Sequence, residues 1–446
     1  MKPAYHVIVI GGAVAGYAAA ISLADKGHAV AVLDKDLDGP RHLGESLDWE
    51  TPAMLDRLGI DLDALLEQDE ATIKAGAVAS HSVITGQATV GFHPIYGLLM
   101  AMVGRSRDTY HVHRAALSRE LRARAEQVGV TLIQVRVATV ETNGDRVTKL
   151  VDEHGHHHTA SHYIDASGRA RVLARQLGIG VTTIGPAKLA LSARMQHAYD
   201  HRGTRVRLDD SRQHSTWIWD INTSNSQTDV GAVLVATDVA NERRNGATIA
   251  DLYRTELGRH PDLHWALEQF TDPSTLERTA FHDQVSDRLV GENWMLAGQA
   301  AAVIDPLLSS GMSFAFRSGL SAGDATHARC AANRQNVWPA KRHDQLLRSY
   351  ALTVDTLLHE LWYESRLRYV HGLAVNVVLL LVCNFNLNHL QARSFARTRL
   401  GVAALMRLHR IARTAVPAAF RLLESIPTPG RRSRGRQTLP IARSST

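Results

Sequence analysis

The stretch VIVIGGAVAG at residues 7–16 decides the fold class. Its first four residues are β-branched, which favours a buried strand, and its glycine-rich part follows without a break. A helix is predicted over 17–26, a second apolar strand over 29–33, and Asp34 stands at the end of that strand. In such a βαβ unit the turn brings backbone N–H groups to a pyrophosphate, and the terminal acid binds the ribose hydroxyls. We therefore expect a bound dinucleotide, although Ala13 replaces the middle glycine of the usual motif.

The composition is that of an ordinary globular protein. The chain has 446 residues, enough for two or three domains, and 45% of them are hydrophobic. Its two cysteines, Cys330 and Cys383, offer no disulfide framework and favour a reducing compartment. The sequence begins without the pattern of a signal peptide, and its longest apolar run, residues 373–383, is shorter than the roughly 20 residues that span a bilayer. A cytoplasmic protein is expected.

Positive charge is concentrated at the C-terminal end. From Gln391 onward there are 12 arginines and one acid, Glu424, whereas the whole chain has a net charge of +6. Such a segment could contact an acidic partner, a carrier protein, a membrane surface or nucleic acid, or it could simply be solvated. The stretch 427–446, rich in arginine, serine and proline, is predicted to be a disordered basic tail.

Hydrophobic periodicity predicts the remaining elements. Short helices are expected at 55–59 and 62–68, a strand over 72–87, and a helix over 113–128. Three strands of one meander are expected at 130–140, 147–151 and 159–164, and the histidine-rich turn 154–158 between the last two favours a hydrated hairpin tip over a metal site. A second, antiparallel sheet is expected from strands at 189–198, 205–208, 217–221 and 230–236. Helices at 249–257 and 263–270, a strand at 294–297, and a helical region from 311 to about 423 complete the prediction.

The predicted fold class is α/β: a Rossmann-like dinucleotide-binding domain, an inserted antiparallel β-sheet substrate domain and a helical C-terminal region. The expected boundaries are 1–185 for the first part of the binding domain, with an insertion at about 60–110, 186–285 for the sheet domain, 286–330 for the second part of the binding domain, 331–426 for the helical region and 427–446 for the tail.

Three further motifs carry a family resemblance. Gly44-Glu45-Ser46, Asp165-Ala166-Ser167-Gly168-Arg169 and the segment DPLLSSG at 305–311 occur in the order seen in flavin monooxygenases related to para-hydroxybenzoate hydroxylase. The resemblance implies bound FAD. In that family a late Gly-Asp element contacts the ribityl chain; here it is Gly298-Gln299, which departs from the pattern.

Two elements resemble the flavin-dependent halogenases more closely. Residues 217–221, WIWDI, are similar to the W-x-W-x-I signature of that family, with Thr216 and Asn222 in place of its flanking Gly and Pro. The order Gly44-Glu45-Ser46, Leu58-Gly59-Ile60 and then Lys74 matches the tryptophan halogenases, in which a lysine at this place is essential for chemistry.

The resemblance implies a set of site residues. The catalytic candidates are Lys74, Asp305 and Glu45, and the candidates for the wall of a substrate tunnel are Trp217 and Trp219. The FAD-binding candidates are Gly11, Gly12, Ala13, Ala15, Gly16, Asp34, Lys35, Glu45, Ser46, Arg114, Val137, Asp165, Gly298, Gln299, Pro306, Ser310, Gly311 and Met312. No metal is expected.

The chemistry implied for the lysine is halogen transfer. In the family, reduced flavin and O2 give a C4a-hydroperoxide, halide attacks it to form hypohalous acid, and the ammonium group presents this species to an electron-rich carbon. Other interpretations stay open: Lys74 as a surface residue on a strand, the two tryptophans as core packing, and Asp305 as a helix N-cap instead of an acid that polarises the lysine or a substrate N–H.

Several functions are consistent with the sequence. The first is halogenation of an electron-rich aromatic, and the second is hydroxylation of an aromatic group, free or on a carrier or peptide. A flavin-dependent prenyl or polyene lipid reductase and a non-catalytic flavin-binding protein are further alternatives. No second glycine-rich dinucleotide motif is found, so a separate flavin reductase is the expected source of reduced flavin. O2 and halide are expected co-substrates, and no nucleic-acid partner is expected.

Overall fold

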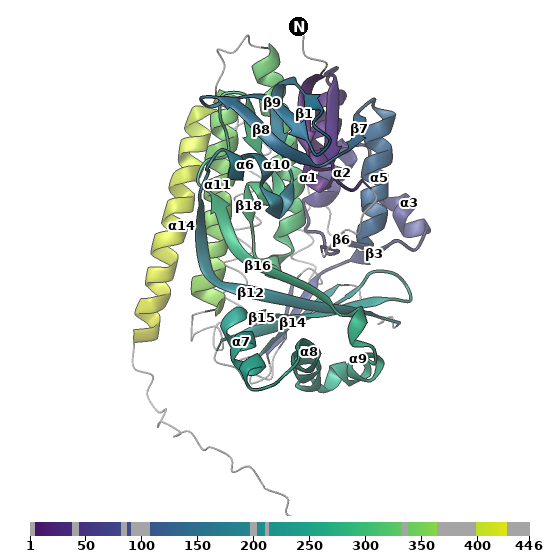
Figure 1. The fold of residues 1–446 in the computed structure, drawn as a ribbon. Coiled ribbons are helices and arrows are strands. Elements are labelled where there is room, and N and C mark those ends of the chain that lie inside the picture. The colour runs from purple at the N-terminus through teal and green to yellow at the C-terminus, as the bar shows by residue number, and fades with distance from the viewer. Residues whose placement is uncertain are drawn as a thin grey trace, which may run out of the picture.

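The computed structural model describes residues 5–37, 44–81, 87–90, 108–196, 203–209, 214–331, 338–363 and 398–425. These residues form the predicted α/β architecture, with a parallel sheet, a larger and mostly antiparallel sheet, and long C-terminal helices (Figure 1). The apolar run 373–383 and the basic stretch 427–446 lie outside the described residues.

A five-stranded parallel sheet carries the glycine-rich turn. Its order is β17-β11-β1-β2-β7, and all neighbouring strands are parallel. The strands are β1 (Tyr5–Ile10), β2 (Val30–Asp34), β7 (Thr131–Gln134), β11 (Ala160–Asp165) and β17 (Trp294–Leu296). Because parallel strands end at the same edge of a sheet, the turns that follow them gather there, which is where α/β folds bind ligands.

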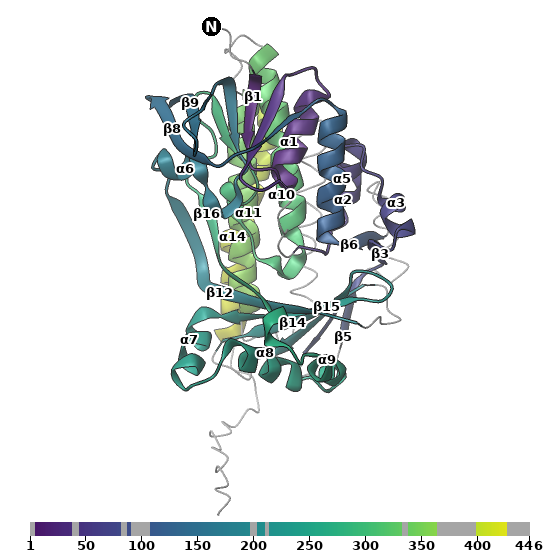
Figure 2. The same ribbon diagram turned by 45° about the vertical axis from the view of Figure 1, so that its right-hand side comes forward.

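Three helices cover this sheet: α1 (Val14–Ala24), α5 (Arg114–Gln127) and α10 (Ser310–Ala331) (Figures 1 and 2). Helix α10 approaches α1 so closely that a Cβ at Gly319 would lie 2.3 Å from the carbonyl oxygen of Ala15. The absence of a side chain at this position lets the late part of the chain close onto the first βαβ unit.

The predicted meander over 130–164 is wrong for two of its strands. Residues 130–140 divide between β7, in the parallel sheet, and β8 (Val137–Asn143), and the segment at 159–164 is β11 of the parallel sheet. The three-stranded sheet is instead β8, β9 (Arg146–Asp152) and β10 (His157–His158). The end of β11 is buried inside the parallel sheet, whereas β8 is largely exposed in the small sheet.

The predicted second sheet is confirmed and is larger than expected, with eight strands in the order β18-β16-β12-β15-β14-β13-β4-β5. Its members are β18 (Ala302–Val303), β16 (Glu277–Ser286), β12 (Val181–Met195), β15 (Thr228–Val235), β14 (Thr216–Asn222), β13 (Thr204–Asp209), β4 (Ala77–His81) and β5 (Gln87–Val90). The segment predicted as one strand over 72–87 therefore divides: β3 (Ala71–Lys74) pairs separately with β6 (Thr109–Val112), and β4 joins the large sheet in parallel with β13.

The two faces of the large sheet pack against different partners. Trp217 and Trp219 point to the core shared with the parallel sheet and the C-terminal helices, whereas Ile218 points to the other side. That other side is covered by α7 (Ala236–Arg244), α8 (Ile249–Gly258) and α9 (His264–Gln269), which lie below the sheet in Figure 2.

The helical C-terminal region is confirmed within the described residues. After α10 come α11 (Trp338–Leu358), the π-helical turn η6 (His359–Tyr363) and α14 (Arg399–Ser425), which lies along α11. The shorter helices are α2 (Thr51–Arg57), α3 (Leu62–Glu67) and α6 (Val172–Gln176). None of the described helices is both long enough and apolar enough to cross a membrane.

Candidate active site

The turn after β1 accepts only glycine at its two ends. Gly11 has a φ of 105°, and a Cβ there would lie 2.4 Å from the carbonyl oxygen of Ala166. A Cβ at Gly16 would lie 1.8 Å from the carbonyl oxygen of Gly11. Ala13 precedes α1 without a side-chain cap, and the first turn of α1 contains no acidic residue. The positive end of α1 is therefore presented without a capping side chain, as the pyrophosphate of FAD requires.

Asp34 is held beside this turn. Its Oδ2 accepts a hydrogen bond from the amide of Gly12 at 2.5 Å, and its Oδ1 accepts one from the amide of Asp36 at 3.0 Å. The carboxylate thus lies where βαβ units bind the ribose of a dinucleotide, and Lys35 follows it directly.

Two later turns come to the same edge of the parallel sheet. A Cβ at Gly298 would lie 2.8 Å from the side chain of Ala15, and the amide of Gly298 donates to Ser318 Oγ at 2.8 Å. Gln299 is exposed, and its Oε1 is 3.8 Å from the position of a Cβ at Gly168. The turns after β1, β11 and β17 therefore lie together and form one cradle; its binding of FAD stays a prediction.

Asp165, one of the predicted FAD-binding residues, holds the turn after β11 with its side chain. Its Oδ1 accepts hydrogen bonds from the amide and hydroxyl of Ser167, and its Oδ2 accepts from the amides of Leu173 and Ala174. Burial raises the pKa of Asp165, and these hydrogen bonds oppose the rise. Its contacts all lie within the turn and the start of α6, so the structure makes it a support of the cradle.

The rest of the predicted FAD set is distributed around the cradle. Pro306 and Gly311 are exposed near the start of α10, where Ser310 is buried. Arg114 begins α5, and Val137 begins β8 and packs into the core. No contact in the structure assigns these residues to a cofactor, so their role stays a prediction.

Lys74 is buried, at 3% exposure, in a polar setting. Its Nζ donates hydrogen bonds to Ser46 Oγ at 2.8 Å, to the carbonyl oxygen of Leu47 at 3.0 Å and to Ser309 Oγ at 3.4 Å. The same nitrogen lies 5.2 Å from the centre of the Trp49 ring. This burial removes the alternative that Lys74 is a surface residue.

The two hydroxyls beside Lys74 come from distant segments. Ser309, with a left-handed φ of 56°, directly precedes α10, and its Oγ donates to Ser46 Oγ at 2.9 Å. The segment before Ser46 lies against α10, because a Cβ at Gly44 would be 3.4 Å from the sulfur of Met312. Lys74 therefore lies where the start of α10 meets residues 44–46.

The pKa of Lys74 is shifted toward neutrality. Burial lowers it from 10.5 to about 8, and the charge of Asp48 opposes part of this shift. Near neutral pH the side chain can thus act as an ammonium donor or as a neutral amine with a free lone pair, which an exposed lysine cannot do.

This shift predicts a pH dependence of stability. Between about pH 8 and pH 10.5 the unfolded chain holds the Lys74 proton more tightly than the folded chain does. The free energy of unfolding should therefore rise with pH across this window, by about 1–3 kcal/mol more in the wild type than in Lys74→Met. Urea unfolding of both proteins at the two ends of the window measures the difference, and an equal change in both would contradict the shift.

Glu45 is buried and belongs to a second charged group, whose arginine is partly exposed. Its Oε1 pairs with Arg194 at 2.5 Å, and Arg194 also contacts His113 Nε2 at 3.0 Å. Burial and the charge of Asp229 raise the pKa of Glu45 to about 8, although Arg194 lowers it, and burial raises the pKa of Asp229 to about 6. Near neutral pH these two carboxyls therefore retain a proton between them.

Asp305 pairs with a lysine that the sequence did not indicate. Its Oδ2 contacts Lys188 Nζ at 2.8 Å and accepts the Tyr363 hydroxyl at 2.8 Å, while its Oδ1 accepts the Leu307 amide at 2.9 Å. The last contact confirms the N-cap interpretation, for the short helix η5 (Pro306–Leu308). Asp305 is thus the partner of Lys188 and not of Lys74.

The two tryptophans of the signature are both anchored. Trp217 and Trp219 are 4% and 7% exposed, and their ring centres lie 5.4 Å apart. Trp219 Nε1 donates to Asp229 Oδ2 at 2.7 Å, and a Cβ at Gly231 would lie 2.1 Å from the Trp219 ring. Because Gly231 leaves the room that Trp219 fills, the ring has one place against β15; its use as a tunnel wall stays a prediction.

The histidine-rich turn forms a hairpin tip, as predicted. Asp152 accepts hydrogen bonds from the amides of His154 and His156, and it lies 2.9 Å from His158 Nε2. The contact with His158 lowers the pKa of Asp152. In the ranges that the structure describes, no cluster of His, Cys, Asp or Glu is arranged to hold a metal ion.

Comparison with protein families decides the class of this site. The family model for tryptophan halogenase matches residues 92–323, more than half of the chain. The chain belongs to the tryptophan halogenase family. The resemblance and the flavin-dependent oxidoreductase class expected from the sequence are thereby confirmed.

Two curated relatives span most of this halogenase-family chain. A 1H-pyrrole-2-carbonyl-(peptidyl-carrier protein) chlorinase of Pseudomonas fluorescens is 27% identical over 73% of this chain and 76% of its own. The ubiquinone hydroxylase UbiL of Rhodospirillum rubrum is 23% identical over 96% of this chain and 92% of its own.

Solved structures share the halogenase fold. The flavin-dependent brominase Bmp2 aligns with a TM-score of 0.66 and 20% identity, over 94% of this chain and 98% of its own. The halogenase PltM, in complex with phloroglucinol and FAD, aligns with a TM-score of 0.65 and 19% identity, over 96% of this chain and 87% of its own.

Several residues around the site were not indicated by the sequence. They are Lys188, Arg194, Asp229, Asp283, Ser309, Asp355 and Tyr363. A partial signal existed, since Lys188 and Asp229 interrupt apolar strands and a charged residue in such a strand needs a partner. A charged residue within an apolar strand is thus recognised from the sequence, but its partner is not.

Proposed function

We propose that this chain is an FAD-dependent halogenase that acts on an electron-rich aromatic substrate, with Lys74 presenting the halogen. One observation carries the proposal: Lys74 is buried among hydroxyls at the start of α10, with a pKa of about 8. The Gly11–Gly16 turn and Asp34 would hold the pyrophosphate and ribose of FAD, and Gly298-Gln299 would lie along its flavin half. Bound reduced FAD supplies, with O2, the oxidant that converts halide to hypohalous acid.

Lys74 can act in either of its protonation states. The ammonium form donates a hydrogen bond to the oxygen of hypohalous acid and makes its halogen more electrophilic. The neutral amine can attack the halogen: an N–X bond forms, the O–X bond breaks, and the amine proton leaves with hydroxide as water. In both cases the halogen passes to a ring carbon that then loses a proton. Ser46 and Ser309 orient the amine, because both of their hydroxyls lie within hydrogen-bond distance of it.

Hydroxylation is the second candidate. The hydroxylase relative spans 96% of the chain, more than the chlorinase does, and Thr216 and Asn222 replace the flanking residues of the halogenase signature. On this proposal the oxidant transfers oxygen directly, and Lys74 is not required.

The partners follow from the same proposal. A separate reductase would supply reduced flavin. The chlorinase relative acts on a pyrrole bound to a peptidyl-carrier protein. Candidate substrates of this chain should therefore be tested both free and attached to a carrier protein.

The experiment measures products under air with reduced FAD and a panel of indoles, phenols and pyrroles, free and carrier-bound. Mass spectrometry should show a gain of bromine that depends on added bromide. A gain of oxygen that is indifferent to bromide would instead establish the hydroxylase. Purified protein that takes up no FAD would contradict both candidates.

A further inference from the structure

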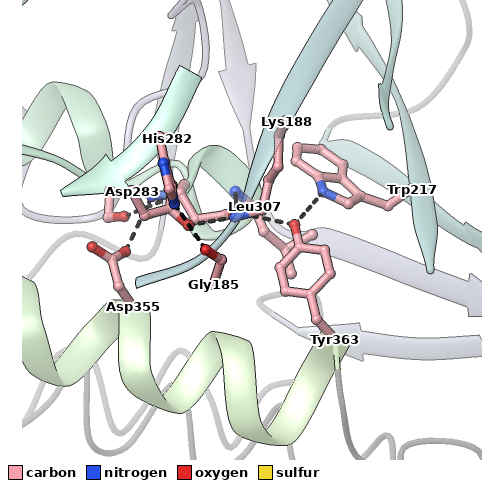
Figure 3. A network of polar contacts seen from close by, with 10 residues as sticks. Gly185, Lys188, Trp217, His282, Asp283, Leu307, Asp355 and Tyr363 are labelled. Atoms are coloured by element: carbon pink, nitrogen blue, oxygen red, sulfur yellow. Dashed lines mark hydrogen bonds and ion pairs between the residues drawn. The ribbon is translucent and has the colours of Figure 1, made fainter. Parts of the chain in front are cut away.

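A buried charged network surrounds Lys188, on the face of the large sheet that carries the tryptophans. Lys188 lies in β12, is 2% exposed, and forms ion pairs with Asp283 of β16 and with Asp305 (Figure 3). Asp355 of α11 joins the group, because its Oδ1 accepts the Asp305 amide at 3.2 Å. The network therefore connects β12, β16, the turn before α10 and helix α11.

Burial and the neighbouring charges shift the pKa values of the groups in this network. Burial lowers the pKa of Lys188, but the nearby charges of Asp305 and Asp283 outweigh this and leave it raised, so Lys188 stays protonated. Burial raises the pKa of Asp283 to about 7 and that of Asp355 well above its ordinary value. Lys188 thus stays an ammonium group between Asp283 and Asp305, while burial favours the protonated forms of Asp283 and Asp355. The ion pair between Lys188 and Asp305 joins this network to the turn before α10.

This ion pair holds Trp217 through one phenol. Trp217 Nε1 donates to the Tyr363 hydroxyl at 2.9 Å, and that hydroxyl donates to Asp305 Oδ2 at 2.8 Å. Lys188 Nζ lies 4.7 Å from the centre of the Tyr363 ring. Figure 3 shows Tyr363, at the end of η6, pointing between Trp217 and Lys188. The phenol is therefore fixed by both its hydroxyl and its ring.

The same carboxylate also holds the turn that reaches Lys74. Asp305 Oδ1 caps η5 through the Leu307 amide, and Ser309 directly follows the last residue of η5. The Ser309 hydroxyl lies between Ser46 and the Lys74 ammonium group. A continuous set of contacts thus runs from the Trp217 indole through Tyr363 and Asp305 to Ser309 and Lys74.

We propose that Tyr363, Asp305 and Lys188 are positioning residues that hold the Trp217 indole in a fixed place relative to the Ser309 hydroxyl, which contacts Lys74. Asp305 is fully buried and both of its oxygens are engaged within the protein, so it acts through its neighbours and does not contact substrate. The proposal rests on the function proposed for Lys74, and it replaces the acid role expected for Asp305.

The second tryptophan provides an internal control. Trp219 is anchored by Asp229, which belongs to the group of Glu45 and Arg194. Tyr363 contacts Trp217 and Asp305, whereas the indole N–H of Trp219 donates to Asp229. Loss of the Tyr363 hydroxyl should therefore affect one indole and spare the other.

The first test is spectroscopic and needs no turnover. In protein labelled with 15N-tryptophan, Tyr363→Phe should shift the indole N–H resonance of Trp217, assigned with Trp217→Phe, and should speed its exchange with solvent. The Trp219 N–H, which donates to Asp229, should keep its slow exchange with solvent. Tyr253→Phe is the matched control, because that buried phenol donates to the carbonyl oxygen of Val230 from α8, on the opposite face of the sheet. An unchanged Trp217 resonance in Tyr363→Phe would overturn the proposal.

The second test is a double-mutant cycle. The measured quantity is the amount of halogenated product formed for each reduced FAD that is oxidised. Tyr363→Phe should lower halogenated product about three- to tenfold, the size expected for one lost hydrogen bond, and should release the difference as hydrogen peroxide. In Trp217→Phe the added Tyr363→Phe change should have little further effect, whereas in Trp219→Phe it should still lower the product. Multiplication in both cycles would overturn the coupling. If wild-type protein gives no halogenated product, the proposed function fails, and the resonance of Trp217 still decides the positioning link.

Discussion

Replacing Lys74 by methionine should abolish halogenated product while oxidation of reduced FAD continues. The expected loss is about 10²–10⁴-fold or more, because the amine is the group that holds the active halogen. Methionine fills a similar volume in the buried site, so the fold and the cradle for FAD should persist. Mass spectrometry measures the product, and a peroxide assay measures the oxidant that is no longer used.

Two variants sharpen this result. Lys149→Met removes a lysine of β9 that pairs with Glu141, away from the site, and should leave product formation unchanged. Lys74→Arg retains a cation and hydrogen-bond donors but has no free lone pair at neutral pH. Residual activity in Lys74→Arg would favour the ammonium route, and its loss would favour the neutral amine. Full activity in Lys74→Met would exclude Lys74 from the reaction.

Replacing Gly16 by alanine should remove FAD binding and destabilise the protein. The new Cβ would lie 1.8 Å from the carbonyl oxygen of Gly11, so the turn must open and the backbone N–H groups must leave the place of the pyrophosphate. Overpacking of this kind costs about 1–3 kcal/mol, and here the obstacle is backbone that cannot rotate away. Titration with FAD and thermal unfolding without flavin measure the two effects.

Gly311→Ala is the control for this substitution. Gly311 lies in the first turn of α10, and nothing lies within 4 Å of a Cβ there. Alanine favours a helix more than glycine does. The free energy of unfolding without flavin should therefore be unchanged or higher by about 1 kcal/mol at most. If FAD occupies the space in front of α10, the affinity of the protein for FAD should fall in Gly311→Ala.

Normal FAD binding in Gly16→Ala would contradict the assignment of the cradle.

Local patterns in the sequence were sufficient for the core of the fold. The β-branched run before Gly11, the helix after it and the second strand ending at Asp34 are contiguous, and each is stabilised by neighbours in the same βαβ unit. The helix predicted over 113–128 is also present, as α5, because its apolar residues recur on one face.

Strand pairing was decided by contacts between distant segments. Alternation indicates that 130–140 and 159–164 are extended, but it does not distinguish a hairpin partner from a strand that crosses to the parallel sheet. β11 lies between β1 and β17 and its end is buried there, whereas β7 pairs with β2 and stays partly exposed. The two residues between β7 and β8 mark where the chain leaves one sheet for the other.

Some residues of the candidate site were found from sequence motifs, and others were found only from tertiary contacts. Motif order alone located Lys74, Glu45, the glycine-rich turn and the two tryptophans, because each of these belongs to a short stretch with its own spacing. Tertiary structure alone gave Asp305 the partner Lys188, 117 positions away, and gave Trp217 the partner Tyr363, 146 positions away. A buried charge or indole N–H must find a partner, but which one it finds depends on how the sheets and helices close, and no local pattern records that closure.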